Sequence, residues 1–156
     1  AGREAAAPPS AERSSGALVL EVGAGESTLY ALVPAAGGVA VHELCKLLGK
    51  LGRREDGGVE ELRQALVKMR TAFVGVSFDR SMLSVIGWHR DLEPTEQREW
   101  YDSLAEVASQ LHAPLAALGA PAMEVHEVAP TMEALYEHAA TAHAAARCGL
   151  DPPVVV

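Results

Sequence analysis

Two glycines and one acid are the residues whose types and spacing most directly suggest chemistry. Gly23 and Gly25 follow an alternating apolar run, and Glu43 stands 20 residues after Gly23. Glycines that follow a strand let the backbone approach a ligand closely, and an acid about 20 residues further on suits a ribose hydroxyl. The pattern would place a nucleotide-like cofactor at the end of the first strand.

The stretch VLEVGAGES resembles the first motif of S-adenosylmethionine-dependent methyltransferases, and VAVHEL resembles their second strand. The resemblance implies that Glu43 binds the cofactor ribose, in a methyltransferase-like domain or a fragment of one. Three features oppose it. Ser27 stands where the third glycine is expected, and Pro34 falls inside the required helix, where proline costs about 3 kcal/mol. Residues 39–44 also run directly into a helical apolar pattern.

A β-hairpin explains the same stretch with fewer conflicts. Leu18, Leu20 and Val22 alternate with other residues at the period of a half-buried strand, and the run containing Leu29, Ala31 and Val33 repeats that period. GAGES then supplies a short glycine-containing turn. The sequence therefore favours two strands joined by a turn over a cofactor loop.

The remaining chemically capable residues show no pattern of a site. The six histidines are His42, His89, His112, His126, His138 and His143. None has a glutamate three residues before it, as helical di-metal sites require, and His138 and His143 lie on different helical faces. The acids Glu99, Asp102, Glu106, Glu133 and Glu137 are expected on solvated helix faces. We therefore predict no catalytic residue, no cofactor and no metal.

The two cysteines, Cys45 and Cys148, lie far apart and form no CxxC motif. This usage indicates a reduced, intracellular compartment, most simply the cytoplasm, and leaves a pairing between the two open.

The elements that would position these residues follow from apolar periodicity. A helical stripe at Val41, Leu44, Cys45, Leu48 and Leu51 predicts a first helix, and one at Val59, Leu62, Ala65, Leu66 and Met69 predicts a second. Residues 72–78 and 81–88, separated by Asp79 and Arg80, predict a second hairpin.

Two long helices are expected after this hairpin. Thr95 can cap the first, and Pro114 should break it near His112. The second begins after Pro130 and ends at Arg147. Its predicted inner face holds Met132, Leu135, Tyr136, Ala139, Ala142, His143 and Ala146. Leu135 and Tyr136 are expected to pack against Leu104 and Leu111.

Composition limits the classes of partner. The 156 residues suit one domain and carry a net charge of −8, which disfavours nonspecific nucleic-acid binding and anionic membrane surfaces. KLLGKLGRR, residues 46–54, is the only basic segment. No apolar run approaches the ~20 residues of a membrane span. Residues 1–16 are expected to be a disordered leader or linker, residues 17–150 one α+β domain, and residues 151–156 a tail.

The predicted fold is α+β: a small antiparallel sheet from two β-hairpins, packed on helices, with two long C-terminal helices. Its ββα opening is similar, in topology alone, to β-grasp, longin and roadblock-type modules. The expected function is that of a soluble, acidic, non-enzymatic protein-interaction domain, an adaptor or subunit of a larger assembly, with protein partners or a second copy of itself. The alternative is the methyltransferase-like domain.

Overall fold

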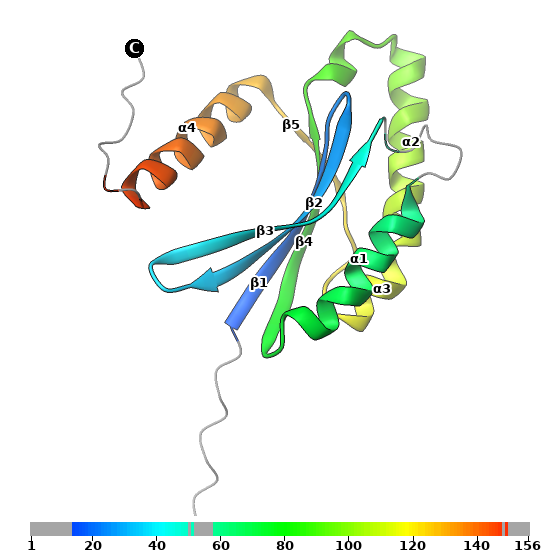
Figure 1. Ribbon diagram of the computed structural model, residues 1–156. Helices are drawn as coiled ribbons and strands as arrows, with labels where there is room; N and C mark the ends of the chain where they lie inside the picture. Colours follow the sequence, from blue (N-terminus) through cyan, green and yellow to red (C-terminus); the bar gives the residue numbers. More distant parts are fainter. Residues whose placement is uncertain (1–13, 50, 52–57, 148, 150–156) are drawn as a thin grey trace, which may run out of the picture.

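The computed structural model describes residues 14–49, 51, 58–147 and 149. Figure 1 shows the arrangement of the elements. The strands are β1 (Ser14–Val22), β2 (Glu26–Ala35), β3 (Gly38–Leu48), β4 (Val76–Ile86) and β5 (Val125–Val128). The helices are α1 (Val59–Ala72), a 3-10 turn η1 (Trp88–Asp91), α2 (Pro94–Gln110), α3 (His112–Ala117) and α4 (Pro130–Arg147).

The five strands form one mixed sheet in the order β3-β2-β1-β4-β5. β1, β2 and β3 are joined antiparallel, whereas β4 runs parallel to β1, and β5 runs parallel to β4. The α+β class is therefore confirmed. The expected small antiparallel sheet from two hairpins is wrong, because β1, β2 and β3 form consecutive hairpins, whereas β4 and β5 join the sheet in parallel by crossover connections.

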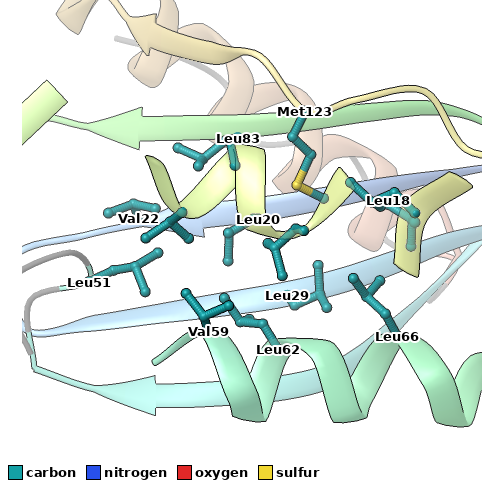
Figure 2. Packing of buried hydrophobic residues seen from close by; sticks show 14 of the residues in the cluster. Leu18, Leu20, Val22, Leu29, Leu51, Val59, Leu62, Leu66, Leu83 and Met123 are labelled. Atoms are coloured by element: carbon teal, nitrogen blue, oxygen red, sulfur yellow. The ribbon is translucent and has the colours of Figure 1, made fainter. Parts of the chain in front are cut away.

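The alternation of β1 and β2 decides which face of the sheet is buried. Leu18, Leu20 and Val22 on β1, and Leu29 and Ala31 on β2, are fully buried. They pack against α1 and the segments around it, as Figure 2 shows for Leu62, Leu66 and Met123. Figure 1 shows α1, α2 and α3 on this face and α4 on the opposite face. The predicted first hairpin and its inward residues are confirmed.

The helices on the core face follow the apolar stripes. α1 buries Val59, Leu62, Leu66 and Met69, as its periodicity predicts. α2 begins two residues earlier than the cap at Thr95 implied, with Glu93 as its N-cap residue and Pro94 at the first helical position. α2 ends at Gln110 and α3 starts at His112, so the break expected from Pro114 is confirmed.

The helix predicted from the stripe at residues 41–51 is wrong, because this segment is strand β3. Its pairing with β2 passes from Glu43 to Cys45, which leaves Leu44 as an extra residue in a β-bulge. A bulge interrupts the period of two. The apolar residues on either side of Leu44 consequently fall at spacings that imitate a helix.

The predicted second hairpin is also wrong, for the same kind of reason. β4 is one continuous strand, and its register with β1 passes from Phe78 to Arg80, so that Asp79 is the extra residue. The polar pair Asp79 and Arg80 marks a bulge in a long strand and not a turn between two strands.

The last helix has the expected bounds but not the expected packing. Leu135 and Tyr136 are 54% and 56% exposed, and they do not pack on the buried Leu104 and Leu111 of the α2 region, because α4 lies across the other face of the sheet. The side chains of Ala142, His143 and Ala146 lie outside the described residues. None of the described helices is long and apolar enough to cross a membrane.

The chain ends remain predictions. β1 begins at Ser14, three residues before the domain boundary that composition predicted at residue 17. Residues 1–13 and 150–156, to which most of the expected leader and all of the expected tail belong, lie outside the described residues.

Candidate functional site

A cavity of about 340 Å³ lies where the three parallel strands end and α4 crosses the sheet. Its lining comes from β1, β4, β5 and α4: Glu21, Ser84, Ile86, Val128, Glu133, Tyr136 and Ala140. In sheets with parallel strands, ligands bind in the crevice outside the carboxyl ends of those strands. This cavity therefore stands where the topology favours a binding site.

Glu21 is the central acid of the cavity. Leu20 and Val22, its neighbours on β1, face the core, so the alternation of the strand turns Glu21 toward the opposite face. Burial raises the pKa of the Glu21 carboxyl, and the nearby charge of Glu26 raises it further. A carboxylate held in this way favours a cation or a proton beside it.

Two hydroxyl side chains flank Glu21 on the same face of the sheet. Thr28 on β2 and Ser84 on β4 are its direct partners in the two strand pairings. They are only 3% and 7% exposed. The row continues outward to Lys46 on β3 and His126 on β5. Glu21 thus sits in the middle of a polar row that crosses all five strands.

α4 supplies a second acid to the cavity, Glu133, and Arg90 of η1 orients it. The Arg90 Nη2 atom donates a hydrogen bond to Glu133 Oε1 at 3.0 Å and another to the Val128 carbonyl. Gly87 lies next to this pair at a φ of 57°, a backbone conformation that favours glycine. Arg90 thereby fixes α4 to the carboxyl ends of β4 and β5.

A second polar group lies on the core side of β5. His89 is 1% exposed, and its Nε2 atom lies 2.9 Å from Glu127 Oε1. The His89 ring stacks on Trp100 and meets Tyr101 edge-on. The hydrogen bond from His89 lowers the pKa of Glu127. Burial, with the Glu127 charge nearby, raises the pKa of Tyr101 to about 12.

This second group supports the cavity and does not line it. Glu127 also lies 3.7 Å from the Arg90 Nε atom, and Arg90 holds Glu133. The chain of contacts therefore runs from the core, through His89 and Glu127, to Arg90 and the cavity acid. Second-layer contacts of this kind keep a site acid in one orientation.

The residues first singled out for a cofactor lie elsewhere. Glu43 is exposed on edge strand β3, across the sheet from β4 and β5. Gly23 and Gly25 form the turn between β1 and β2, where the Gly23 amide donates to the Glu26 carbonyl. No helix follows this turn, so the methyltransferase-like reading, which needs a strand, a loop and a helix in succession, is wrong.

The histidines and the remaining acids are dispersed. The described residues contain no group of three or more histidine, cysteine or acidic side chains placed to hold a metal. Glu99, Asp102 and Glu106 are exposed on α2, as expected for a solvated face. Glu133 was expected to be solvated too, yet it lines the cavity. Cys45 is half-buried on β3, and Cys148 lies outside the described residues.

Sequence reasoning missed Glu21, Ser84 and Glu133. Glu21 had a usable signal, because it is the one acid in an otherwise apolar alternating strand. Ser84 and Glu133 had none, since their meeting depends on the parallel pairing of β4 with β1 and on the position of α4.

No protein-family model matches the sequence, and no curated protein is significantly similar to it. Solved structures are similar in fold. A nucleoside triphosphate hydrolase from Neospora caninum aligns with a TM-score of 0.54 and 10% identity over 86% of this chain and 32% of its own. The Ppx/GppA family member from Aquifex aeolicus aligns with a TM-score of 0.47 and 16% identity over 83% of this chain and 40% of its own. RuvC from T. thermophilus, in complex with a Holliday junction substrate, aligns with a TM-score of 0.45 and 12% identity over 90% of this chain and 84% of its own.

The chain thus spans only 32% of the length of the Neospora enzyme and 40% of the length of the Aquifex protein. The Neospora likeness shows a fold shared with a hydrolase. It corrects the expectation of a non-enzymatic adaptor or complex subunit, which rested on an antiparallel ββα opening of the β-grasp, longin or roadblock kind. That opening does not form, because β3 stands where its helix was expected.

Proposed function

We propose that this chain is a hydrolase-type domain whose cavity binds the phosphate groups of a phosphoanhydride, such as a nucleoside triphosphate, together with a divalent cation. The observation that carries the proposal is Glu21, a half-buried carboxyl with a raised pKa near the carboxyl end of β1, flanked by the hydroxyls of Thr28 on β2 and Ser84 on β4. The shared fold of the Neospora nucleoside triphosphate hydrolase supports this choice of ligand.

The donor set of the cavity fits a hard cation. Glu21 and Glu133 offer carboxylate oxygens, and Ser84 offers a hydroxyl. Mg²⁺ is commonly held by one or two carboxylates, several waters and the phosphates of the substrate. When bound, the cation would neutralise phosphate charge that two acids would otherwise repel.

The residues of this chain then have distinct roles. Glu21, whose burial raises its pKa, favours a cation beside its carboxylate and acts as a cation ligand. The hydroxyls of Ser84 and Thr28 can donate hydrogen bonds along the same row. Arg90 keeps Glu133 turned toward the cavity.

Calorimetric titration of the full chain tests this function. The probes are a non-hydrolysable ATP analogue and inorganic tripolyphosphate, each with Mg²⁺. We expect saturable binding that needs Mg²⁺ and falls about 10-fold or more in Glu21→Gln and in Glu133→Gln, because each loses a cation ligand. Glu60→Gln is the matched control, because Glu60 is an exposed acid of α1 that does not line the cavity. This variant should bind both probes as the parent does.

The relative affinities for the two probes show which part of the ligand is recognised. Equal affinity for both probes would show that the phosphates are the recognised part, and preference for the ATP analogue would add a nucleoside contact. Absence of binding by the parent to either probe, or unchanged binding in Glu21→Gln, would contradict the proposal. Release of phosphate from ATP, measured on the same samples, reports whether this chain alone turns substrate over.

A further inference from the structure

β3 forms one edge of the sheet along its whole length. It pairs with β2 on one side, and no other described strand lies beyond it on the other. It is 11 residues long, which is long for an edge strand. An open edge presents backbone groups that can pair with another strand. Figure 1 shows the turn of the β2–β3 hairpin projecting away from α1, so α1 covers only part of the hairpin.

Five side chains of β3 share the face of the sheet that is turned away from the core helices. They are Val39, Val41, Glu43, Lys46 and Leu48, whose partners on β2 are Pro34, Leu32, Tyr30, Thr28 and Glu26. Those partners alternate along one regular strand and therefore point to one face. The bulge at Leu44 is what brings Glu43 and Lys46, three residues apart, onto the same face.

The last four of these residues, from Val41 to Leu48, follow a symmetric order along the strand: apolar, acidic, basic, apolar. A second β3 laid antiparallel, with its midpoint between Leu44 and Cys45, would place Val41 opposite Leu48 and Glu43 opposite Lys46. Each contact would occur twice about a two-fold axis. Val41 at 63% and Leu48 at 72% are the most exposed large apolar side chains of the strand.

We propose that β3 pairs with β3 of a second copy of this chain, which joins the two five-stranded sheets into one continuous sheet. The register is fixed by two Glu43–Lys46 ion pairs and two Val41–Leu48 contacts across the axis. A lysine and a bulge on an edge strand discourage pairing with an arbitrary strand. Here the same two features favour a partner with the same residue order. The edge is separated by β2 from the strands that line the cavity, β1, β4 and β5, so the dimer does not depend on the function proposed for the cavity.

Sedimentation velocity of the full chain over a range of concentrations tests the pairing. We expect a monomer–dimer equilibrium for the parent. Glu43→Lys and Lys46→Glu should each weaken it about 10-fold or more, because like charges then lie directly opposite each other. The double variant Glu43→Lys/Lys46→Glu should restore the dimer, since it exchanges the two charges and keeps the pairs. This rescue separates loss of pairing from loss of folding.

Glu26→Gln provides the matched control. Lys46 forms an ion pair with Glu26 of its own chain, at 2.9 Å, so Lys46→Glu disturbs that contact as well. Glu26→Gln removes the internal pair alone and should leave the dimer intact. Loss of the dimer in this control would assign the effect to the internal pair and contradict the proposed register.

A disulfide trap tests the register directly. In a Cys45→Ser/Cys148→Ser background, Val41→Cys/Leu48→Cys should form a covalent dimer under mild oxidation, because opposed residues of antiparallel strands are close enough for a disulfide. Val41→Cys alone should not, since the two copies of residue 41 would lie about 20 Å apart along the strands. The proposal would be overturned if the parent remained monomeric at every concentration. It would also be overturned if Glu43→Lys and Lys46→Glu both left the dimerisation constant unchanged.

Discussion

Glu21 and Glu127 are two acids whose surroundings act on them in opposite directions. Burial disfavours the charged form of Glu21 and raises its pKa, whereas the hydrogen bond from His89 favours the charged form of Glu127 and lowers its pKa. Both side chains have an ordinary pKa of 4.5. Folding therefore makes one carboxylate harder to form and the other easier, and each shift changes how stability depends on pH.

We predict that Glu21→Gln raises the free energy of unfolding at pH 7. In the parent, the unfolded chain loses the Glu21 proton near pH 4.5, before the folded chain does, so stability falls as the pH rises through this window toward the raised pKa. Glutamine has nearly the same shape and no charge to desolvate. Urea unfolding at pH 4 and pH 7 measures the effect, and a variant less stable than the parent at pH 7 would contradict it.

Glu127→Gln should have the opposite effect. The stabilising contribution of Glu127 is present above its unfolded pKa of 4.5 and is lost as the pH falls through the lowered folded value. The variant should be less stable than the parent at pH 7 and should lose less stability in acid. Because half of the Glu127 side chain is exposed to solvent, we expect the difference to be modest. If parent and variant lost the same stability as the pH falls below 4.5, the result would argue against a stabilising His89–Glu127 contact.

At the scale of elements, the sequence predicts what depends on local periodicity. The β1–β2 hairpin, α1, and the bounds of α4 follow from regular apolar spacing. β3 and β4 do not, because the bulges at Leu44 and Asp79 shift the alternation halfway along each strand. The cavity could not be predicted either. Glu21, Ser84 and Glu133 meet only through a crossover pairing and a helix placed on the second face of the sheet.

Gly16 lies near the start of β1, Gly25 lies in the turn that follows β1, and the two differ in the space around them. A Cβ atom at Gly16 would lie 2.9 Å from the Leu32 carbonyl oxygen and 2.9 Å from the Phe78 ring, whereas one at Gly25 would meet nothing within 4 Å. We predict that Gly16→Ala lowers stability by about 1–3 kcal/mol through overpacking. Gly25→Ala should change it by about 0.5 kcal/mol or less. Thermal melts of the two variants compare them, and equal melts would show that β1 and β4 can separate to admit a methyl group.

The helices on the two faces of the sheet should respond differently to loss of a leucine. Leu104 of α2 is fully buried, and Leu135 of α4 is 54% exposed. Leu104→Ala should cost about 2–5 kcal/mol, because it leaves a cavity in the core. Leu135→Ala should cost about 0.5 kcal/mol or less. A large loss in Leu135→Ala would mean that α4 packs on the core after all, as the sequence first suggested.

For the molecule as a whole, the two faces of the sheet are held by different forces. The face that carries α1, α2 and α3 is closed by a continuous apolar core, and none of the buried core residues comes from the described side chains of α4. α4 is instead joined through Arg90, which contacts both Glu133 and the Val128 carbonyl. Segments with few buried apolar contacts open at lower free energy than the core does. Because α4 carries Glu133, its opening would also open the proposed binding cavity.

We therefore predict that Arg90→Met frees α4 while the core stays folded. Amide hydrogen exchange should speed up across α4 and remain unchanged in β1 and β2, because the lost contacts tie only the helix to the sheet. Arg98→Met, which removes an exposed arginine from α2, is the matched control and should leave both regions unchanged. Mg²⁺ with the ATP analogue should slow exchange in α4 of the parent, since a ligand on Glu133 favours the closed helix. If Arg90→Met accelerated exchange in all elements alike, α4 would be part of the same cooperative unit as the core, and its opening could not be the step that admits a ligand.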